Sequence, residues 1–436
     1  MEVEGRSSVI EMKGHRKVSL RANVGWALVG NVGYTGFQWG ILVCIAKLGN
    51  AVDVGQFALG LAVTAPVVTL ANLHLRILEA TDARRDYPFA VYFSLRLITS
   101  TLAIAAIAVI ALASGYHDAT LALILAVGLA KAFESVSDVV YGLLQEAENL
   151  RRIAVSMLAK GLLSVLTVAV VLRLTGNLVF ATLAMALGWA TLLMLYDLSA
   201  AYRIASIRPA GDFRALARLA WLAAPMGCVA ALGSLTTNVP RYSIEANLGS
   251  TGLGHFAAVA YLFVAGGQPM MAVGAAVMPR LARFFVTDLK AYRRLTAWTV
   301  MSAVALGLAG VTIAALAGRV ILTIAYAPEY AREAPVLVWM ALAAGVGFAN
   351  KALAFSVTAA RRLTEQLPIA LLSLAVAALA SHFLVPRWGL IGAAWAVLAT
   401  EAMRLLCLGV IYAHSIYSAG AMPVSALPPQ RVANTG

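Results

Sequence analysis

The sequence repeats one pattern along its length: an apolar stretch of about 20 residues followed by a short polar break. A helix of that length covers the roughly 30 Å hydrocarbon layer of a membrane. Short buried helices of a soluble fold would need polar faces at a period of about 3.6 residues, and these stretches lack them. We therefore expect an all-α integral membrane protein. Its twelve predicted helices span, to within a few residues, 24–46, 56–76, 88–113, 121–145, 153–173, 178–200, 216–239, 253–278, 295–317, 334–357, 366–385 and 389–414.

Composition supports lipid as the solvent of this chain. Apolar residues make up 61% of its 436 residues and charged residues 12%, about half the share usual in a soluble fold. This composition excludes a soluble enzyme, a nucleic-acid-binding domain and a secreted disulfide scaffold. The three cysteines lie in apolar stretches and the six histidines are scattered, so we expect neither a metal site nor a cofactor.

The basic residues predict the topology. The first apolar stretch is too long for a signal-peptide core, so we expect it to be retained. With residues 1–23 inside, the inner segments hold 22 of the 33 Lys and Arg and the outer loops hold six. Because basic residues collect in cytoplasmic loops, both termini are expected in the cytoplasm. The polar, Pro-bearing segment 415–436 is expected to be a disordered tail.

Weak internal similarity predicts a duplication. Gly55-Gln56-Phe57-Ala58 is followed about 200 residues later by Gly254-His255-Phe256-Ala257, and Arg151-Arg152 by Arg361-Arg362. Six helices per repeat give two halves of equal orientation: a lobe at 24–200, a cytoplasmic linker at 201–215 and a lobe at 216–414. In transporters built this way the substrate site lies between the repeats. The alternative is a duplicated channel or scaffold.

Several short motifs resemble a known family over nearly the whole chain. They are Ala46-Lys47-Leu48-Gly49 with Val54-Gly55-Gln56-Phe57-Ala58, Leu75-Arg76 with Ala80-Thr81-Asp82, Ala224-Pro225-Met226-Gly227, Asn238-Val239-Pro240-Arg241-Tyr242, Tyr326 with Glu329-Tyr330, and Val385-Pro386 with Gly389-Leu390-Ile391-Gly392. The chain resembles the O-antigen and capsule flippases, the polysaccharide branch of the multidrug/oligosaccharidyl-lipid/polysaccharide exporter superfamily.

The resemblance implies a two-lobed transporter with no catalytic residues. Its implied substrate is an undecaprenyl-pyrophosphate-linked oligosaccharide, moved from the inner to the outer leaflet of the bacterial inner membrane with the energy of an ion gradient. A polysaccharide polymerase and glycosyltransferases are the implied partners, besides membrane lipid.

Charges within the spans are the candidate site residues, since each costs at least about 2.5–3.5 kcal/mol to insert. In the fourth predicted helix, Lys131, Glu134, Asp138, Tyr141 and Gln145 fall on one stripe roughly 80° wide. That stripe must line a watery cavity or pair with another helix. Lys131 can neutralise only one of the two carboxylates, so Glu134 or Asp138 is a candidate for coupling to a proton.

The other intramembrane charges are Arg96, Lys160, Lys351, Glu401 and Arg404. Arg96 and Lys160 either supply a countercharge to Asp138 or extend to the membrane surface. The spacing of Glu401 and Arg404 suits an intrahelical ion pair. Lys351 has no carboxylate on its own helix. Five cations against three carboxylates predict a positive cavity, with Lys131, Lys351, Arg404, Arg96 and Lys160 as substrate ligands and Asp138, Glu134 and Glu401 as ion-coupling residues.

Two other functions fit the same hydropathy. A cation-coupled multidrug exporter would need an acidic cavity, which the charge count disfavours. A membrane-embedded glycan polymerase or ligase usually carries a long outer loop, and no predicted outer loop exceeds about 20 residues.

Overall fold

A computed structural model describes residues 20–82, 84–362 and 365–421, which are almost entirely helical. Long apolar stretches form helices in lipid, because each backbone group must find its hydrogen-bond partner within the chain. In chain order the helices are α1 (Leu20–Leu48), α2 (Ala51–Asn72), α3 (Leu75–Thr81), α4 (Phe89–Ala113), α5 (Asp118–Glu146), α6 (Leu150–Thr175), α7 (Leu178–Leu192), the π-helical turn η1 (Leu193–Asp197), α8 (Leu198–Tyr202), α9 (Phe213–Gly266), α10 (Gln268–Thr287), α11 (Leu289–Ala325), the 3₁₀ turn η2 (Pro328–Glu333), α12 (Ala334–Ala359) and α13 (Gln366–Ala421).

Ten helices of the described chain are long and apolar enough to cross a membrane, and two of them account for four crossings. Helices α9 and α13, with 54 and 56 residues, each contain one non-helical glycine. Gly249 has φ 67° and Gly389 has φ 57°, a left-handed region that glycine adopts without steric cost. The chain reverses its direction at each of these glycines, so α9 and α13 each contribute two crossings. These ten helices therefore give twelve crossings, and the expectation of about twelve transmembrane helices is confirmed.

The second predicted span is two helices. Asn50 caps α2 by accepting hydrogen bonds from the amides of Val52 and Asp53. Helix α2 ends where Leu73 and His74 adopt left-handed φ values of 49° and 51°, and the short helix α3 follows. The predicted continuous helix over 56–76 is therefore wrong in its last turn. The break turns α3 so that it packs against α5.

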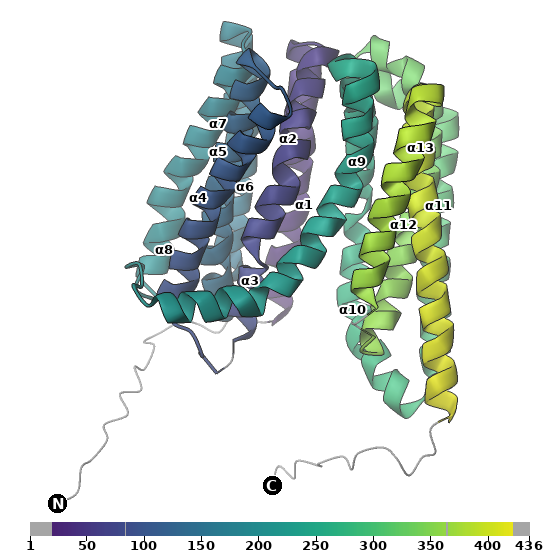
Figure 1. The fold of residues 1–436 in the computed structure, drawn as a ribbon. Helices are drawn as coiled ribbons and strands as arrows, with labels where there is room; N and C mark the ends of the chain where they lie inside the picture. The colour runs from purple at the N-terminus through teal and green to yellow at the C-terminus, as the bar shows by residue number, and fades with distance from the viewer. Residues whose placement is uncertain (1–19, 83, 363–364, 422–436) are drawn as a thin grey trace, which may run out of the picture.

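The helices form two bundles, α1–α8 on one side and α10–α13 on the other, with α9 running between them (Figure 1). We call these the N-terminal and C-terminal bundles. The first turns of α9 lie on the N-terminal bundle, where Leu216, Leu219 and Ala223 join the apolar cluster around Leu75. Further along, α9 packs against α13. The lobe that the sequence predicts to begin at residue 216 thus starts with a segment attached to the other bundle.

The two repeats meet at one end of the molecule. Gly55 of α2 lies so close to the carbonyl of Ser250 that a Cβ atom would overlap it, and Gly254 of α9 has the same relation to Ala51. Two aromatic side chains bridge the bundles nearby. Trp39 Nε1 donates to the Tyr326 hydroxyl at 2.8 Å, and the Tyr242 hydroxyl donates to the Ala62 carbonyl at 2.5 Å.

The first and last described residues, Leu20 and Ala421, lie at the opposite end from this contact (Figure 1). We call that end the terminal face. The connections α3–α4, α5–α6, α8–α9 and α12–α13 lie there as well. An even number of crossings requires both ends of the described chain to lie on one side.

Candidate functional site

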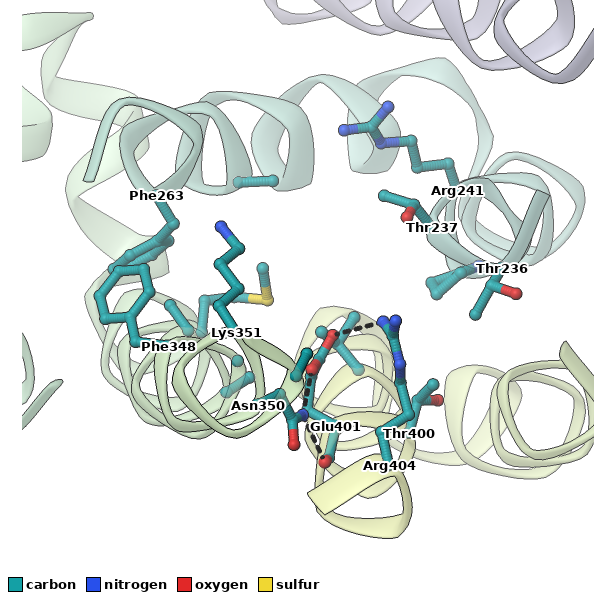
Figure 2. Close-up of a pocket in the computed structure, with 18 of the residues that line it drawn as sticks. Thr236, Thr237, Arg241, Phe263, Phe348, Asn350, Lys351, Thr400, Glu401 and Arg404 are labelled. Carbon is teal, nitrogen blue, oxygen red and sulfur yellow. Dashed lines mark hydrogen bonds and ion pairs between the residues drawn. The ribbon is translucent and has the colours of Figure 1, made fainter. Parts of the chain in front are cut away.

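The C-terminal bundle encloses a cavity of about 360 Å³ between α9, α12 and α13 (Figure 2), here called the C-bundle cavity. Apolar residues such as Phe256, Met340 and Val397 form much of its wall. Its charged lining consists of Arg241, Lys351, Glu401 and Arg404. Three cations therefore face one carboxylate, and the cavity favours an anionic ligand.

Glu401 is already engaged. Its Oε1 lies 3.6 Å from Arg404 Nη1, one turn away on α13, which is the intrahelical pair that the spacing predicts. Asn350 of α12 donates its side-chain amide to Glu401 Oε2 at 2.6 Å and to the Glu401 carbonyl at 2.8 Å (Figure 2). These contacts fix the carboxylate against the cavity wall.

Lys351 has no ion-pair partner among the described residues. Its Nζ lies 5.8 Å from the centroid of the Phe348 ring, a cation–π contact within α12. The side chain is exposed, and its amino group points into the space between α12 and α9 (Figure 2). Lys351 is thus free to bind a ligand's negative charge.

Arg241 lines this cavity, although it falls in the loop between the predicted helices 216–239 and 253–278. Helix α9 continues past residue 239 to Gly249, so Arg241 lies within the helix and faces the cavity. Its Nη1 donates to Asn238 at 2.8 Å, and its guanidinium lies 5.9 Å from the Tyr261 ring centroid. The motif Asn238-Val239-Pro240-Arg241-Tyr242 was the available signal, because a polar residue and a cation three apart fall on one helix face.

A second cavity of about 230 Å³ continues from the first toward the terminal face. The two share Thr236, Ala354, Arg404 and Leu408. Beyond them the lining combines aliphatic residues, among them Val229, Ile369 and Ile411, with a few polar ones. It ends near the ion pair of Arg362 and Glu365, whose atoms lie 3.6 Å apart. An apolar space therefore adjoins the cationic one.

The stripe on the fourth predicted helix, now α5, lines a cavity of about 310 Å³ in the N-terminal bundle. Lys131, Glu134 and Asp138 face this N-bundle cavity, opposite Thr69 and Asn72 of α2. Lys131 Nζ lies 2.7 Å from Glu134 Oε2, so these two neutralise each other. The other Glu134 oxygen accepts a hydrogen bond from the Tyr34 hydroxyl of α1.

Asp138 has two cationic partners. Arg76 of α3 approaches it at 3.2 Å and Arg96 of α4 at 3.7 Å. Arg96 is 0% exposed and also donates to the Asn72 side chain and carbonyl. Of the two alternatives for Arg96, the countercharge is the one observed. Buried behind Asp138, Arg96 does not line the N-bundle cavity, and its assignment as a substrate ligand stays a prediction.

Lys160 is likewise not a cavity residue. Its Nζ lies 2.7 Å from Asp197 Oδ2 of the π-helical turn, with 2% and 0% of the two side chains exposed. Ser156 donates to the other Asp197 oxygen at 2.6 Å, and Lys160 donates to the Tyr141 hydroxyl at 3.0 Å. The count of three intramembrane carboxylates omitted Asp197. Lys160 is therefore neutralised within the bundle and does not reach the surface, and its assignment as a substrate ligand stays a prediction.

No cluster of His, Cys, Asp and Glu suited to a metal ion occurs within residues 20–82, 84–362 and 365–421. The chemistry that the described residues offer is the binding of anionic groups beside an apolar space.

Two bundles of membrane-crossing helices around internal charged cavities define a multi-pass membrane protein with a transporter fold. The chain belongs to the family described as polysaccharide biosynthesis protein, whose profile matches residues 20–285. The capsular polysaccharide biosynthesis protein CapF of Staphylococcus aureus is 26% identical over 394 residues, which are 89% of this chain and 98% of that protein.

Solved transporter structures share the fold at low sequence identity. An inward-facing multidrug resistance transporter of the MATE family and MOP superfamily matches with a TM-score of 0.70 and 14% identity, covering 91% of this chain and 98% of that one. The lipid II flippase MurJ in an inward closed conformation matches with a TM-score of 0.69 and 10% identity, covering 93% and 94%. The predicted fold and the predicted resemblance to polysaccharide biosynthesis proteins are confirmed.

Proposed function

We propose that this protein translocates an undecaprenyl-pyrophosphate-linked oligosaccharide across the bacterial inner membrane for the synthesis of O-antigen, capsule or exopolysaccharide. The observation that carries the proposal is the charge of the C-bundle cavity, where Arg241, Lys351 and Arg404 face Glu401 alone. Membership of a polysaccharide biosynthesis family and the similarity to CapF support the substrate class.

Pyrophosphate is the part of this substrate that the cavity would recognise. Arginine offers a planar fork of donors to phosphate oxygens and lysine offers a compact charge. Glu401 offsets one of the three cations, so about two positive charges remain for the ligand. The N-bundle cavity has less positive charge to give a ligand. Lys131 is paired with Glu134, and both arginines near Asp138 are paired with that carboxylate.

The lipid chain would occupy the adjoining apolar space. The second cavity meets the first at Arg404 and Leu408, so a pyrophosphate near Arg404 would have its polyprenyl chain beside Val229, Ile369 and Ile411. The similarity of the fold to that of the lipid II flippase MurJ supports a lipid-linked substrate.

The proposal includes an orientation and an energy source. Basic residues gather toward the terminal face, which we assign to the cytoplasm. We propose that an ion gradient drives the translocation, as the resemblance to the flippase family implies. Glu134, Asp138 and Glu401 each have cationic partners, which favours a structural role for them over ion coupling. A polysaccharide polymerase and glycosyltransferases are the proposed partners of the pathway.

A multidrug exporter is the second candidate, because the MATE transporter has the same fold. A cationic drug would be repelled by Arg241, Lys351 and Arg404, which disfavours it. A glycan polymerase or ligase is disfavoured by the short connections between the described helices at the face opposite the termini.

Deletion of the gene tests the proposed function in cells. We expect lipid-linked glycan to accumulate in the inner leaflet, and a copy of the wild-type gene should reverse this. If lipid-linked glycan still reaches the outer leaflet at the normal rate while drug sensitivity rises, the multidrug exporter is the correct function.

A further inference from the structure

Glu79 of α3 is a buried carboxyl group that none of the contacts described above uses. Its side chain is 3% exposed, and neither carboxylate oxygen has a hydrogen-bond partner among the described residues. It presses on α5 at Gly142, where an added Cβ atom would overlap Glu79 Oε2. The carboxyl group is thus enclosed between two helices without a donor.

The charged and titratable groups around Glu79 are already paired. Glu79 lines a cavity of about 20 Å³, enough for about one water molecule, together with Asp82, Tyr92 and Glu146. Arg85 pairs with Glu146 at 3.0 Å, and Asp82 accepts from the Tyr92 hydroxyl at 3.2 Å. The groups that face Glu79 are Asp138 and Glu146 from α5, Arg96 and Tyr92 from α4, Asp82, Arg85 and Tyr87 from the connection after α3, and Arg76 from α3 itself.

Three arginines face Glu79, and none of them donates to it. Arg85 is paired with Glu146. Arg96 directs its terminal nitrogens to Asn72 and Asp138, and Arg76 donates from Nη1 to Asp138 and from Nε to Gln145. An ionised Glu79 would therefore be a buried charge without a hydrogen bond and close to two other carboxylates. Such a charge is strongly unfavourable, whereas a neutral carboxylic acid fits the site.

We propose that Glu79 is a proton-binding site, and that the bound proton keeps α3 packed on α5. Helix α3 follows two residues with left-handed φ, Leu73 and His74, a conformation that persists only when its surroundings hold it. Loss of the proton would place a charge against Gly142 and Glu146 and push α3 away. Because Arg76 lies on the same helix, its contact with Asp138 at the N-bundle cavity would change as well.

The proposal is tested by the thermal stability of the full-length protein in detergent between about pH 5 and about pH 8. As the pH rises, the unfolded chain releases the Glu79 proton first while the folded protein retains it, so stability falls. We expect the difference between wild type and Glu79→Gln to grow by about 1–2 °C per pH unit. Near pH 5 the two should melt together. Glu148→Gln, which changes an exposed carboxylate outside the cavity that Glu79 lines, should keep the wild-type slope.

Three results would overturn the proposal. Parallel pH profiles of wild type and Glu79→Gln would mean that Glu79 takes up no proton on folding. A lower melting temperature of Glu79→Gln at every pH would mean an ionised Glu79 paired with Arg96. Stabilisation of wild type, but not of the variant, by NaCl relative to choline chloride would mean a cation site. If Glu79→Gln does not fold, Glu79→Met keeps the neutral state and is expected to give the same flatter profile.

Discussion

Gly55 and Gly254 occupy equivalent positions in the two repeats, 199 residues apart. The backbone at each glycine packs against the start of the helical segment that contains the other glycine. Gly55 meets Ser250, while Gly254 meets Ala51, which is the reciprocal contact expected of a two-fold arrangement. The motif that revealed the duplication in the sequence is therefore also the place where the two halves touch.

This contact predicts the effect of a single methyl group. In Gly55→Ala or Gly254→Ala the new Cβ would overlap a backbone carbonyl, which cannot move aside as a side chain can. We expect the bundles to separate at this face. A cysteine placed at Ala51 should then react faster with a water-soluble thiol reagent. In the control Gly25→Ala, where nothing lies within 4 Å, the reaction rate should be unchanged. Equal rates in all variants would contradict a closed contact here.

The buried pair of Lys160 and Asp197 predicts a stability pattern. Asp197→Asn should destabilise the protein by about 3–5 kcal/mol, because it leaves the Lys160 charge buried without its countercharge. The double variant Lys160→Met with Asp197→Leu should recover most of the loss, since apolar replacements of similar volume remove both charges. Thermal melting in detergent measures both effects. A double variant no more stable than Asp197→Asn would show that the hydrogen bonds from Ser156 to Asp197 and from Lys160 to Tyr141 matter more than the charge pair.

The substitution Asp138→Asn distinguishes a structural role of this carboxylate from a role in ion coupling. Two arginines lie within 4 Å of it, so we expect Asp138→Asn to lower stability by about 1–3 kcal/mol. Any transport left in reconstituted vesicles should still depend on an imposed pH gradient. Loss of gradient dependence in a protein of normal stability would instead assign the coupling role to Asp138.

The topology is tested by a reporter fusion. An alkaline phosphatase fused after Ser418 should be inactive, because that enzyme folds only outside the cytoplasm. The same enzyme inserted between Thr175 and Asn177, at the opposite face, should be active. The reverse pattern would place the terminal face outside.

Hydropathy predicts the crossings of this fold because every segment in lipid must satisfy its own backbone. The reversals at Gly249 and Gly389 fall close to predicted polar breaks, so the number of helices was predictable. The ends of the helices were less predictable than their number. The first part of α9 reaches Gly249 rather than residue 239, and this difference places Arg241 in the C-bundle cavity instead of a loop.

Ion-pair partners were the least predictable feature of the site. Pairs within one helix, such as Lys131 with Glu134, follow from spacing alone. Lys160 and Asp197 lie 37 residues apart on different elements, and only the packing of α6 against the end of α7 brings them together. Glu79 falls between the predicted helices 56–76 and 88–113, because a short helix after a break leaves little trace in hydropathy.

The most direct test of the proposed function is the movement of an undecaprenyl-pyrophosphate-linked oligosaccharide between leaflets of vesicles that contain the purified protein. We expect the wild type to expose the glycan on the opposite leaflet. Lys351→Gln and Arg241→Gln should each weaken apparent affinity by roughly ten- to a hundred-fold, the equivalent of one charged contact of about 1.5–3 kcal/mol. Arg319→Gln, an exposed residue of α11 outside both cavities, should match the wild type. Transport at the wild-type rate by a Lys351→Gln, Arg241→Gln double variant would contradict the cationic cavity, and no movement by the wild type under an imposed ion gradient would contradict the function itself.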